Sequence, residues 1–298
     1  MLGFFRSYRE QGWSPISADE YQNAWLQWGG SVITHPEIVA SLSELSDIEV
    51  KYLGWIHNGD LQAAIPVWGR HLALAKAVLK RQKKRDVFDL GNAEIILPQA
   101  RGSEISLRHS GDYISDLHAG RITTLKPQKE GLALAREPEQ YSRKFRYNQR
   151  REQRLLIEQG GTITPVNQLS AAQKAQIYTV LFEKRWGFAV PGKNYLTEVF
   201  TLLGDFMTGS FISINEQPVA FQVLYRVESP GWISVEYING GVDPGFNELS
   251  PGSVLSFVNT QAEWNYAREL AKPLRYSFGR ADREYKDRWC NRVSVFEV

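Results

Sequence analysis

The chain has 298 residues, and its 35 basic and 33 acidic residues leave a formal net charge of only +2. A balance this even gives no overall field to attract nucleic acid, and no run of about 18 apolar residues predicts a membrane-spanning helix. The single cysteine, Cys290, excludes an internal disulfide and suits a reducing compartment such as the cytoplasm, and the five histidines never fall at metal-ligand spacing, so no metal is expected.

A helix followed by a β-hairpin is predicted twice along the chain. In the first half, residues 17–28 predict the helix, and residues 47–68 predict two strands joined by an Asn-Gly turn. In the second half, residues 169–186 predict the helix and residues 209–226 the hairpin. The two copies are offset by about 160 residues, which favours a duplicated domain.

Further elements follow the second hairpin. Residues 231–244 predict a strand that ends in glycines and an Asp-Pro turn. A helix is predicted to begin with Ser250 as its N-cap and Pro251 in its first position, and strands are predicted at 274–278 and 292–298. This order of elements predicts an α/β (α+β) domain in which helices flank a mixed sheet.

The densest basic segment is YSRKFRYNQRREQRLLIEQGG, residues 141–161. Four arginines fall within about 80° of each other on a helical wheel: Arg143, Arg146, Arg150 and Arg154. Guanidinium groups match the paired oxygens of phosphate and carboxylate, and only Glu152 and Glu158 could neutralise this stripe. The stripe therefore indicates anion recognition or contact with a membrane surface, with a solvated helix face as the alternative.

A second basic cluster, KRQKKR at residues 80–85, ends the apolar run HLALAKAVL. An amphipathic segment with a basic end can lie on anionic lipid. A solvated loop after a helix is the alternative interpretation.

Two features of the second half carry possible chemistry. Glu236 stands among apolar neighbours in a predicted strand, where burial would raise its pKa and suit it to act as a general base, unless the strand edge exposes it. The helix that begins with ELSPGS could hold a phosphate at its N-terminus, which makes Ser250 and Gly252 candidate substrate-binding residues.

The segment YSFGRADREYKDRWC, residues 276–290, has an unusual polar face. If the part after Gly279 is helical, one face carries a carboxylate, a phenol, an ammonium and an indole: Asp282, Tyr285, Lys286 and Trp289. The opposite face would form the i,i+4 pairs Arg283–Asp287 and Glu284–Arg288. Cys290 has no His or Asp motif beside it and is expected to be a core residue rather than a nucleophile.

Three segments in this order resemble the acyltransferase superfamily that contains the Fem-type aminoacyl transferases and the cellulose-biosynthesis-like acetyltransferases, which share the Gcn5-related fold. In RKFRYNQRREQR, Arg146 and Arg150 occupy the places of the family's repeated arginines. ELSPGSVL is similar to the family's Ser-Pro-Gly helix start. FGRADREYKDRW contains the aromatic-Lys pair that is implicated in catalysis in Fem-type enzymes, which carries over onto Tyr285 and Lys286.

Over the full length, including SDLHAGRITTLK at 115–126, the chain resembles the bacterial macrophage-inducible Mig-fourteen family. The resemblance implies tandem Gcn5-related N-acyltransferase-like domains at 1–135 and 136–298, each a mixed sheet flanked by helices. Members are linked to resistance against cationic antimicrobial peptides and to the inner membrane, and were once described as transcriptional activators. It thus implies a cytoplasmic protein, which can be peripheral at the inner membrane.

The resemblance implies transfer of an acyl or aminoacyl group to an amine or hydroxyl of a cell-envelope component. Glu236 would be the base and Lys286 would stabilise the oxyanion, with Tyr285 packing or donating beside it and Asp282 orienting Lys286. A non-catalytic protein that binds anionic lipid or peptide at the inner membrane is the alternative, and a transcriptional activator is the third.

The expected donor is acyl-CoA or aminoacyl-tRNA, and its anionic parts would bind Arg146 and Arg150. Many Gcn5-related enzymes hold the coenzyme A pyrophosphate on a loop of basic and glycine residues before the central helix. Here residues 240–253 read GGVDPGFNELSPGS, without that spacing. The departure puts coenzyme A in doubt and leaves aminoacyl-tRNA, or loss of activity, open.

Overall fold

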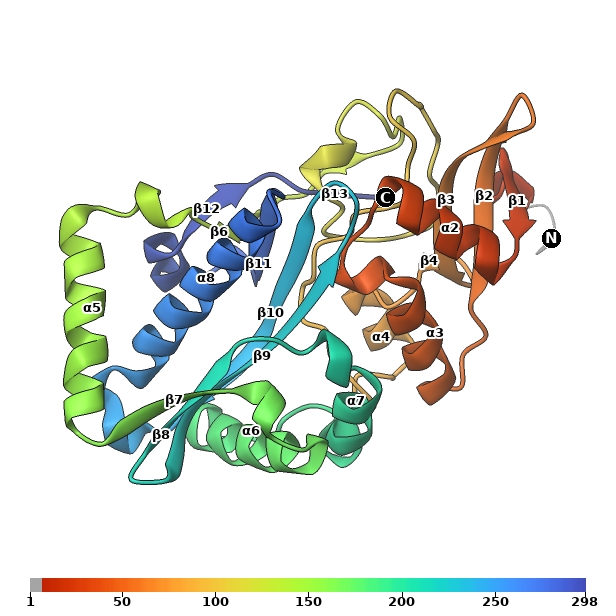
Figure 1. The fold of residues 1–298 in the computed structure, drawn as a ribbon. Helices are drawn as coiled ribbons and strands as arrows, with labels where there is room; N and C mark the ends of the chain where they lie inside the picture. Colours follow the sequence, from red (N-terminus) through yellow and green to blue (C-terminus); the bar gives the residue numbers. More distant parts are fainter. Residues whose placement is uncertain (1–6) are drawn as a thin grey trace.

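The computed structural model describes residues 7–298. A four-stranded sheet lies at one end of the molecule and a seven-stranded sheet fills the other, with the two-stranded pair of β5 (Lys126–Pro127) and β13 (Phe296–Glu297) between them (Figure 1). The mixed α/β architecture with helices flanking the sheets is the predicted fold class.

The four-stranded sheet has the order β1-β2-β3-β4, and its strands pair antiparallel. They are β1 (Trp13–Ile16), β2 (Lys51–His57), β3 (Asp60–Trp68) and β4 (His71–Leu72). A mixed sheet was expected here, but the two-residue turns that join β2 to β3 and β3 to β4 permit only antiparallel pairing. Three helices accompany this sheet: α2 (Ala18–Trp28), α3 (Pro36–Leu45) and α4 (Lys76–Arg81).

The helix and the hairpin turn predicted in the first half are confirmed. Asn58 and Gly59 both have positive φ, 52° and 88°, as a tight hairpin turn requires. Ser17 caps α2: its hydroxyl accepts from the Glu20 N–H, and the Glu20 carboxylate accepts from the Ser17 N–H.

The seven-stranded sheet has the order β12-β6-β11-β10-β9-β8-β7. Its strands are β6 (Leu132–Ala135), β7 (Gly161–Pro165), β8 (Ser210–Ile214), β9 (Gln217–Glu228), β10 (Ile233–Val242), β11 (Leu274–Arg280) and β12 (Cys290–Val293). Only β10 and β11 run parallel within it, and the other neighbours are antiparallel. The sheet is therefore mixed, as predicted.

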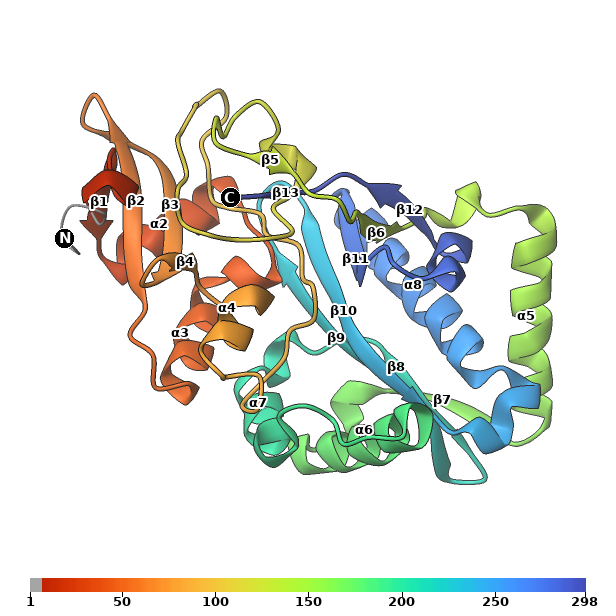
Figure 2. The same cartoon turned by 180° about the vertical axis from the view of Figure 1, so that it is seen from behind.

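Helices cover both faces of this sheet (Figure 2). They are α5 (Arg143–Glu158), α6 (Ala171–Trp186), α7 (Leu196–Leu202) and α8 (Pro251–Glu269). The Tyr178 ring of α6 lies 6.1 Å from the Phe221 ring of β9, whereas Gln222, the next residue of β9, donates to Ser256 of α8 at 2.8 Å. Because side chains alternate along a strand, α6 and α8 lie on opposite faces.

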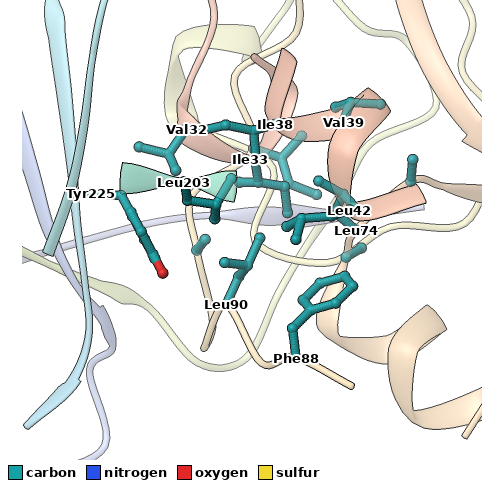
Figure 3. Packing of buried hydrophobic residues seen from close by; sticks show 14 of the residues in the cluster. Val32, Ile33, Ile38, Val39, Leu42, Leu74, Phe88, Leu90, Leu203 and Tyr225 are labelled. Carbon is teal, nitrogen blue, oxygen red and sulfur yellow. The ribbon is translucent and has the colours of Figure 1, made fainter. Parts of the chain in front are cut away.

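One hydrophobic cluster joins the two halves of the chain (Figure 3). Val32 and Leu90 from the first half pack in the same cluster as Leu203 and Tyr225 from the second. The strand β6, which ends at residue 135 where the second domain was expected to begin, pairs with β11 and β12 of the large sheet. Residues 7–298 contain no helix that is both long and apolar enough to cross a bilayer.

The helix predicted after Gly279 is only the 3₁₀ helix η8 (Glu284–Arg288). Neither expected i,i+4 ion pair forms within residues 7–298, because the segment is too short and too tightly turned to align them. Asp287 instead accepts from Arg292 of β12, with the Nε–Oδ1 distance at 2.7 Å. Ser250 does occupy the N-cap of α8, but with a left-handed backbone (φ 49°) and no side-chain cap bond.

Candidate functional site

The parallel strands β10 and β11 stop pairing halfway along their length. Their register runs from Ile233 opposite Leu274 to Glu236 opposite Ser277 and then ends, although β10 continues to Val242. Beyond this point β10 pairs only with β9, and a bulge between Tyr237 and Asn239 shifts that register. The edge of β10 that faces β11 is thus left without a strand partner.

Two cavities meet at this opening in the sheet. The first, here called the aromatic cavity, has a volume of about 330 Å³ and lies beside α6. The second, here called the α8 cavity, has a volume of about 480 Å³ and lies at the N-terminus of α8. Arg185, Tyr237 and Tyr285 line both cavities, so the two cavities are direct neighbours.

The aromatic cavity combines rings with a few charges. Its rings come from several separate segments of the chain, among them Phe88, Tyr178, Trp186, Phe188, Tyr225 and Phe278. Charged side chains stand at its wall, where Arg85 pairs with Asp89 at 2.7 Å. Such a lining suits an amphiphilic ligand that has an apolar body and a polar head.

The α8 cavity is lined by small and polar residues. Gly240, Gly241 and the α8 start from Ser250 to Ser253 form one wall, and Arg288 adds a positive charge. The N-terminal end of a helix carries partial positive charge, which favours an anion there. The candidate residues Ser250 and Gly252 therefore lie where the sequence predicted an anionic ligand to bind.

The C-terminal end of α6 is fastened to β10. Arg185 donates from Nη1 to the Gly240 carbonyl at 3.1 Å, and the Trp186 indole N–H points to the same oxygen at 3.4 Å. Gly241 allows this approach, because a Cβ there would lie 2.5 Å from the backbone of Leu181. Sequence reasoning missed Arg185 and Tyr237, although the Asn-Gly-Gly at the end of β10 signals a bulge.

Lys286 is held by the segment that it follows. Its ammonium donates to the carbonyl oxygens of Phe278 at 2.8 Å and Arg280 at 2.7 Å, and it lies 3.7 Å from the Asp282 carboxylate. Burial lowers the pKa of Lys286, while the charge of Asp282 opposes that shift. Lys286 fixes the end of β11 where that strand leaves β10.

Asp282, Tyr285 and Lys286 all line the aromatic cavity, so three of the four proposed catalytic residues lie together. Burial would raise the pKa of Asp282, but its hydrogen bond to Arg280 and the charge of Lys286 hold that pKa below its usual range. A carboxylate stabilised in this way is a weak base. Cys290 is buried, and burial raises the pKa of its thiol to about 12, which makes it a poor nucleophile.

Glu236 lies at the seam between the two halves and lines neither cavity. It is buried, and its Oε1 accepts from the backbone N–H of Glu94 at 2.8 Å. Burial and the nearby Glu94 charge raise the pKa of Glu236 well above its usual value. Glu94 in turn accepts from Arg275, with the Nε–Oε2 distance at 3.0 Å, and Arg275 also pairs with Asp116 at 2.7 Å.

Arg146 and Arg150 also line neither cavity. They flank Gln149 on α5, and Gln149 accepts from the Ser253 hydroxyl at 3.1 Å. Helix α5, which carries the arginine stripe, contacts the start of α8 through this bond and lies at the outer edge of the molecule (Figure 1). Within residues 7–298, no group of three or more His, Cys, Asp and Glu side chains could hold a metal ion.

Comparison with solved structures identifies the class of this fold. FemX is 10% identical and has a TM-score of 0.56 over 96% of this chain and 95% of that chain. L-PGS from Bacillus licheniformis matches at a TM-score of 0.49, with 12% identity over 89% of this chain and 76% of that chain. An acetyltransferase from the GNAT family from Colwellia psychrerythraea matches at 0.42, with 11% identity over 96% of this chain and 98% of that chain.

The likeness to FemX shows that the chain has the same fold as that protein, in agreement with the mixed α/β fold that the sequence predicted. The Mig-14 family model matches residues 35–298, and the chain belongs to that family. No curated protein matches the sequence.

Proposed function

We propose that the protein transfers an acyl or aminoacyl group, and that the reaction takes place where β10 and β11 separate. The observation that carries this proposal is that two chemically different cavities share Arg185, Tyr237 and Tyr285 at one opening in the sheet. A two-substrate transfer needs such an arrangement, because donor and acceptor must meet while water is kept out.

The donor would occupy the α8 cavity. Both expected donors, acyl-CoA and aminoacyl-tRNA, carry phosphates, which suit the N-terminus of α8 and Arg288. Phosphates further along a long donor would reach Arg146 and Arg150, because α5 contacts α8 through Gln149 and Ser253. The chain lacks the usual loop for the coenzyme A pyrophosphate, so aminoacyl-tRNA is the donor that we favour.

The acceptor would bind in the aromatic cavity with its amine or hydroxyl toward β10. Its nucleophilic atom attacks the donor carbonyl, and the resulting oxyanion would be stabilised by N–H groups on the unpaired edge of β10. The acceptor proton then leaves to a nearby base or water, and the donor leaves as the free thiol or the tRNA hydroxyl. The aromatic lining favours an amphiphilic envelope component, whose acylation would change its attraction for cationic peptides.

Lys286 would act in this reaction as a positioning residue. Its ammonium is already shared between the Phe278 and Arg280 carbonyls and Asp282, so it sets the place of Tyr285 and the end of β11. Glu236 lies outside both cavities. We therefore assign it a structural role in the contact between the two halves of the chain rather than a role in proton transfer.

Replacing Lys286 by methionine is expected to lower kcat about a hundredfold, because small displacements of reacting groups carry a cost of that size. The KM for the donor should change little, since the α8 cavity is untouched. The measurement follows labelled amino acid from charged tRNA, or acetyl from acetyl-CoA, into envelope lipid, and a thermal shift with each donor alone identifies which one binds.

Lys286→Arg retains the positive charge and the hydrogen-bond donors, and its kcat should lie between those of Lys286→Met and the parent. Such a partial recovery would show that the low kcat of Lys286→Met is not caused by loss of folding alone. Arg101→Gln, an exposed change outside both cavities, is the matched control. Full kcat in folded Lys286→Met would show that the site is elsewhere.

A second candidate function, binding to an anionic membrane surface without catalysis, is favoured by the outer face of α5. Tyr147 is 63% exposed and Ile157 is 52% exposed on this helix, beside Arg150 and Arg154. Exposed apolar side chains among arginines are typical of helices that lie on anionic lipid.

This candidate predicts that the protein floats with phosphatidylglycerol vesicles at low salt and is released at high salt. The double variant Arg150→Gln/Arg154→Gln should weaken vesicle binding about thirtyfold, at about 1 kcal/mol for each of the two charges. Arg101→Gln again serves as the control. If vesicle binding changes neither with salt concentration nor in the double variant, the outer face of α5 is not the membrane-binding surface.

A further inference from the structure

A hollow of about 430 Å³ in the first half of the chain is lined by arginines. It is here called the arginine hollow and consists of Tyr8, Arg9, Arg70, Arg81, Arg108 and Ser110. Helix α4 connects it to the proposed active site, because Lys76 at one end of α4 lines the aromatic cavity and Arg81 at the other end lines this hollow. The two sites share no lining residue.

The four arginines come from four separate segments of the chain. Arg70 lies in the turn after β3, Arg81 ends α4, and Arg108 lies in the extended segment that follows. Folding brings these like charges together around one hollow, which costs electrostatic energy unless counter-charge is supplied. Convergence of this kind is a property of the tertiary structure, since no two of the four lie within ten positions of each other.

Direct ion pairs supply little of that counter-charge, although the charge of Arg81 also acts on the Asp112 carboxyl. Arg9 lies 3.6 Å from Glu10, but no ion pair joins Arg70, Arg81 or Arg108 to a carboxylate within residues 7–298. Arg108 instead stacks on the Tyr8 ring at 4.7 Å, and the Arg70 Nε donates to the neutral His71 Nε2 at 3.3 Å. These contacts orient the guanidinium groups without neutralising them.

Buried polar atoms beside the hollow also lack partners. The Nε of Arg9 is buried and makes no hydrogen bond, and the fully buried His109 has neither ring nitrogen bonded within the described part of the chain. Burial lowers the pKa of His71, and the charges of Arg81, Arg70 and Arg9 lower it further. The hollow thus has a positive field, and one of its lining residues, Arg9, has a buried donor without a partner.

We propose that the arginine hollow is a second binding site, specific for a phosphate-type dianion. Guanidinium groups bind phosphate oxygens through paired N–H donors, and four of them around one hollow supply both the charge and the geometry for this. The phosphate can belong to a soluble molecule or to a lipid headgroup, because both present the same oxygens. The site is independent of the transfer reaction proposed above.

The test titrates the full chain with pyrophosphate by calorimetry and measures flotation with phosphatidylcholine vesicles that contain or lack phosphatidic acid. The double variant Arg70→Gln/Arg81→Gln should weaken binding about a hundredfold, at about tenfold for each charge-assisted contact. Arg101→Gln, another exposed arginine, should bind as the parent does. Without anion, the double variant should melt at the same or a higher temperature, because repulsion in the hollow is relieved.

If the double variant Arg70→Gln/Arg81→Gln loses pyrophosphate binding, the ligand is a soluble phosphate compound. If Arg70→Gln/Arg81→Gln loses vesicle binding and Arg101→Gln keeps it, the ligand is a lipid headgroup. Absence of binding in both arms, or equal binding by parent and double variant, would overturn the proposal. Vesicle binding that persists here but disappears in Arg150→Gln/Arg154→Gln belongs to α5 and also counts against the hollow. A lower melting temperature of the anion-free double variant would indicate a structural role for these arginines.

Discussion

Replacing Arg275 by methionine is expected to lower the free energy of unfolding by about 3–5 kcal/mol, the cost of leaving a buried charge without its partner. Arg275 is the cation between Glu94 and Asp116, and Glu94 is almost wholly buried. These contacts join β11 to the first half of the chain. Their loss would leave the Glu94 carboxylate beside Glu236 with no cation to balance it, as urea unfolding of parent and variant would measure.

Glu236→Gln is the matched control for Arg275→Met. The pKa of Glu236 is raised well above its usual value, which favours the neutral side chain in the folded protein, and we expect glutamine to cost about 1 kcal/mol or less near neutral pH. An acid whose folded pKa is raised contributes stability below its unfolded pKa of about 4.3 and loses it as pH rises toward the folded value. The parent should therefore lose more stability than Glu236→Gln as pH rises through that window.

If Arg275→Met lowers the free energy of unfolding by less than about 1 kcal/mol, the charges of the buried ion pairs contribute little to stability, and the side chains act mainly by filling space. A stability profile of Glu236→Gln that follows the parent at every pH would show that Glu236 is ionised in the folded protein. The two measurements thus separate the contribution of charge to stability from the contribution of packing, for the group formed by Arg275, Glu94 and Glu236.

Gly241→Ala is expected to destabilise the fold by about 3 kcal/mol, at the upper end of the cost of overpacking a core. The added Cβ would lie 2.5 Å from Leu181 Cβ, Leu181 C and the Phe182 nitrogen. Most of these atoms belong to the backbone, so α6 has to move as a unit. Displacing α6 would also draw Arg185 and Trp186 away from the Gly240 carbonyl and disturb both cavities.

The measurement for Gly241→Ala is thermal unfolding together with donor binding. Gly204→Ala is the matched control, because a Cβ at Gly204 meets no atom within 4 Å, and its stability should stay level or rise by a few tenths of a kcal/mol. If Gly241→Ala has the same melting temperature as Gly204→Ala and the parent, α6 does not pack closely on β10.

Local chemistry allowed many elements to be predicted. The Asn58-Gly59 turn, the helix at the start of the first half and the start of α8 at Pro251 are confirmed because each depends on residues a few positions apart. The segment after Gly279 shows the limit of such reasoning. Its side chains have helical spacing, but Lys286 binds the carbonyls of Phe278 and Arg280 and the backbone turns too tightly for an α-helix.

The candidate site could be predicted only in part. Asp282, Tyr285 and Lys286 lie within one short segment and do share a cavity wall, and Ser250 and Gly252 lie at the predicted helix end. Glu236 looked like a base because a strand with an acid among apolar residues fits that role. Its actual environment depends on Glu94, which is 142 positions away, and no local pattern reveals that contact.

Residues that lie close together in the sequence were enough to predict the hairpins, most of the longer helices, the fold class and the basic face of α5, because propensity, capping and turn chemistry act over a few residues. The tertiary structure alone decided where β10 and β11 separate, which side chains meet there and which arginines surround the hollow. Arg185, Tyr237 and Tyr285 are about 50 positions apart from one to the next and come together only when α6, β10 and η8 pack. Such long-range packing sums many weak contacts and leaves no local pattern in the sequence.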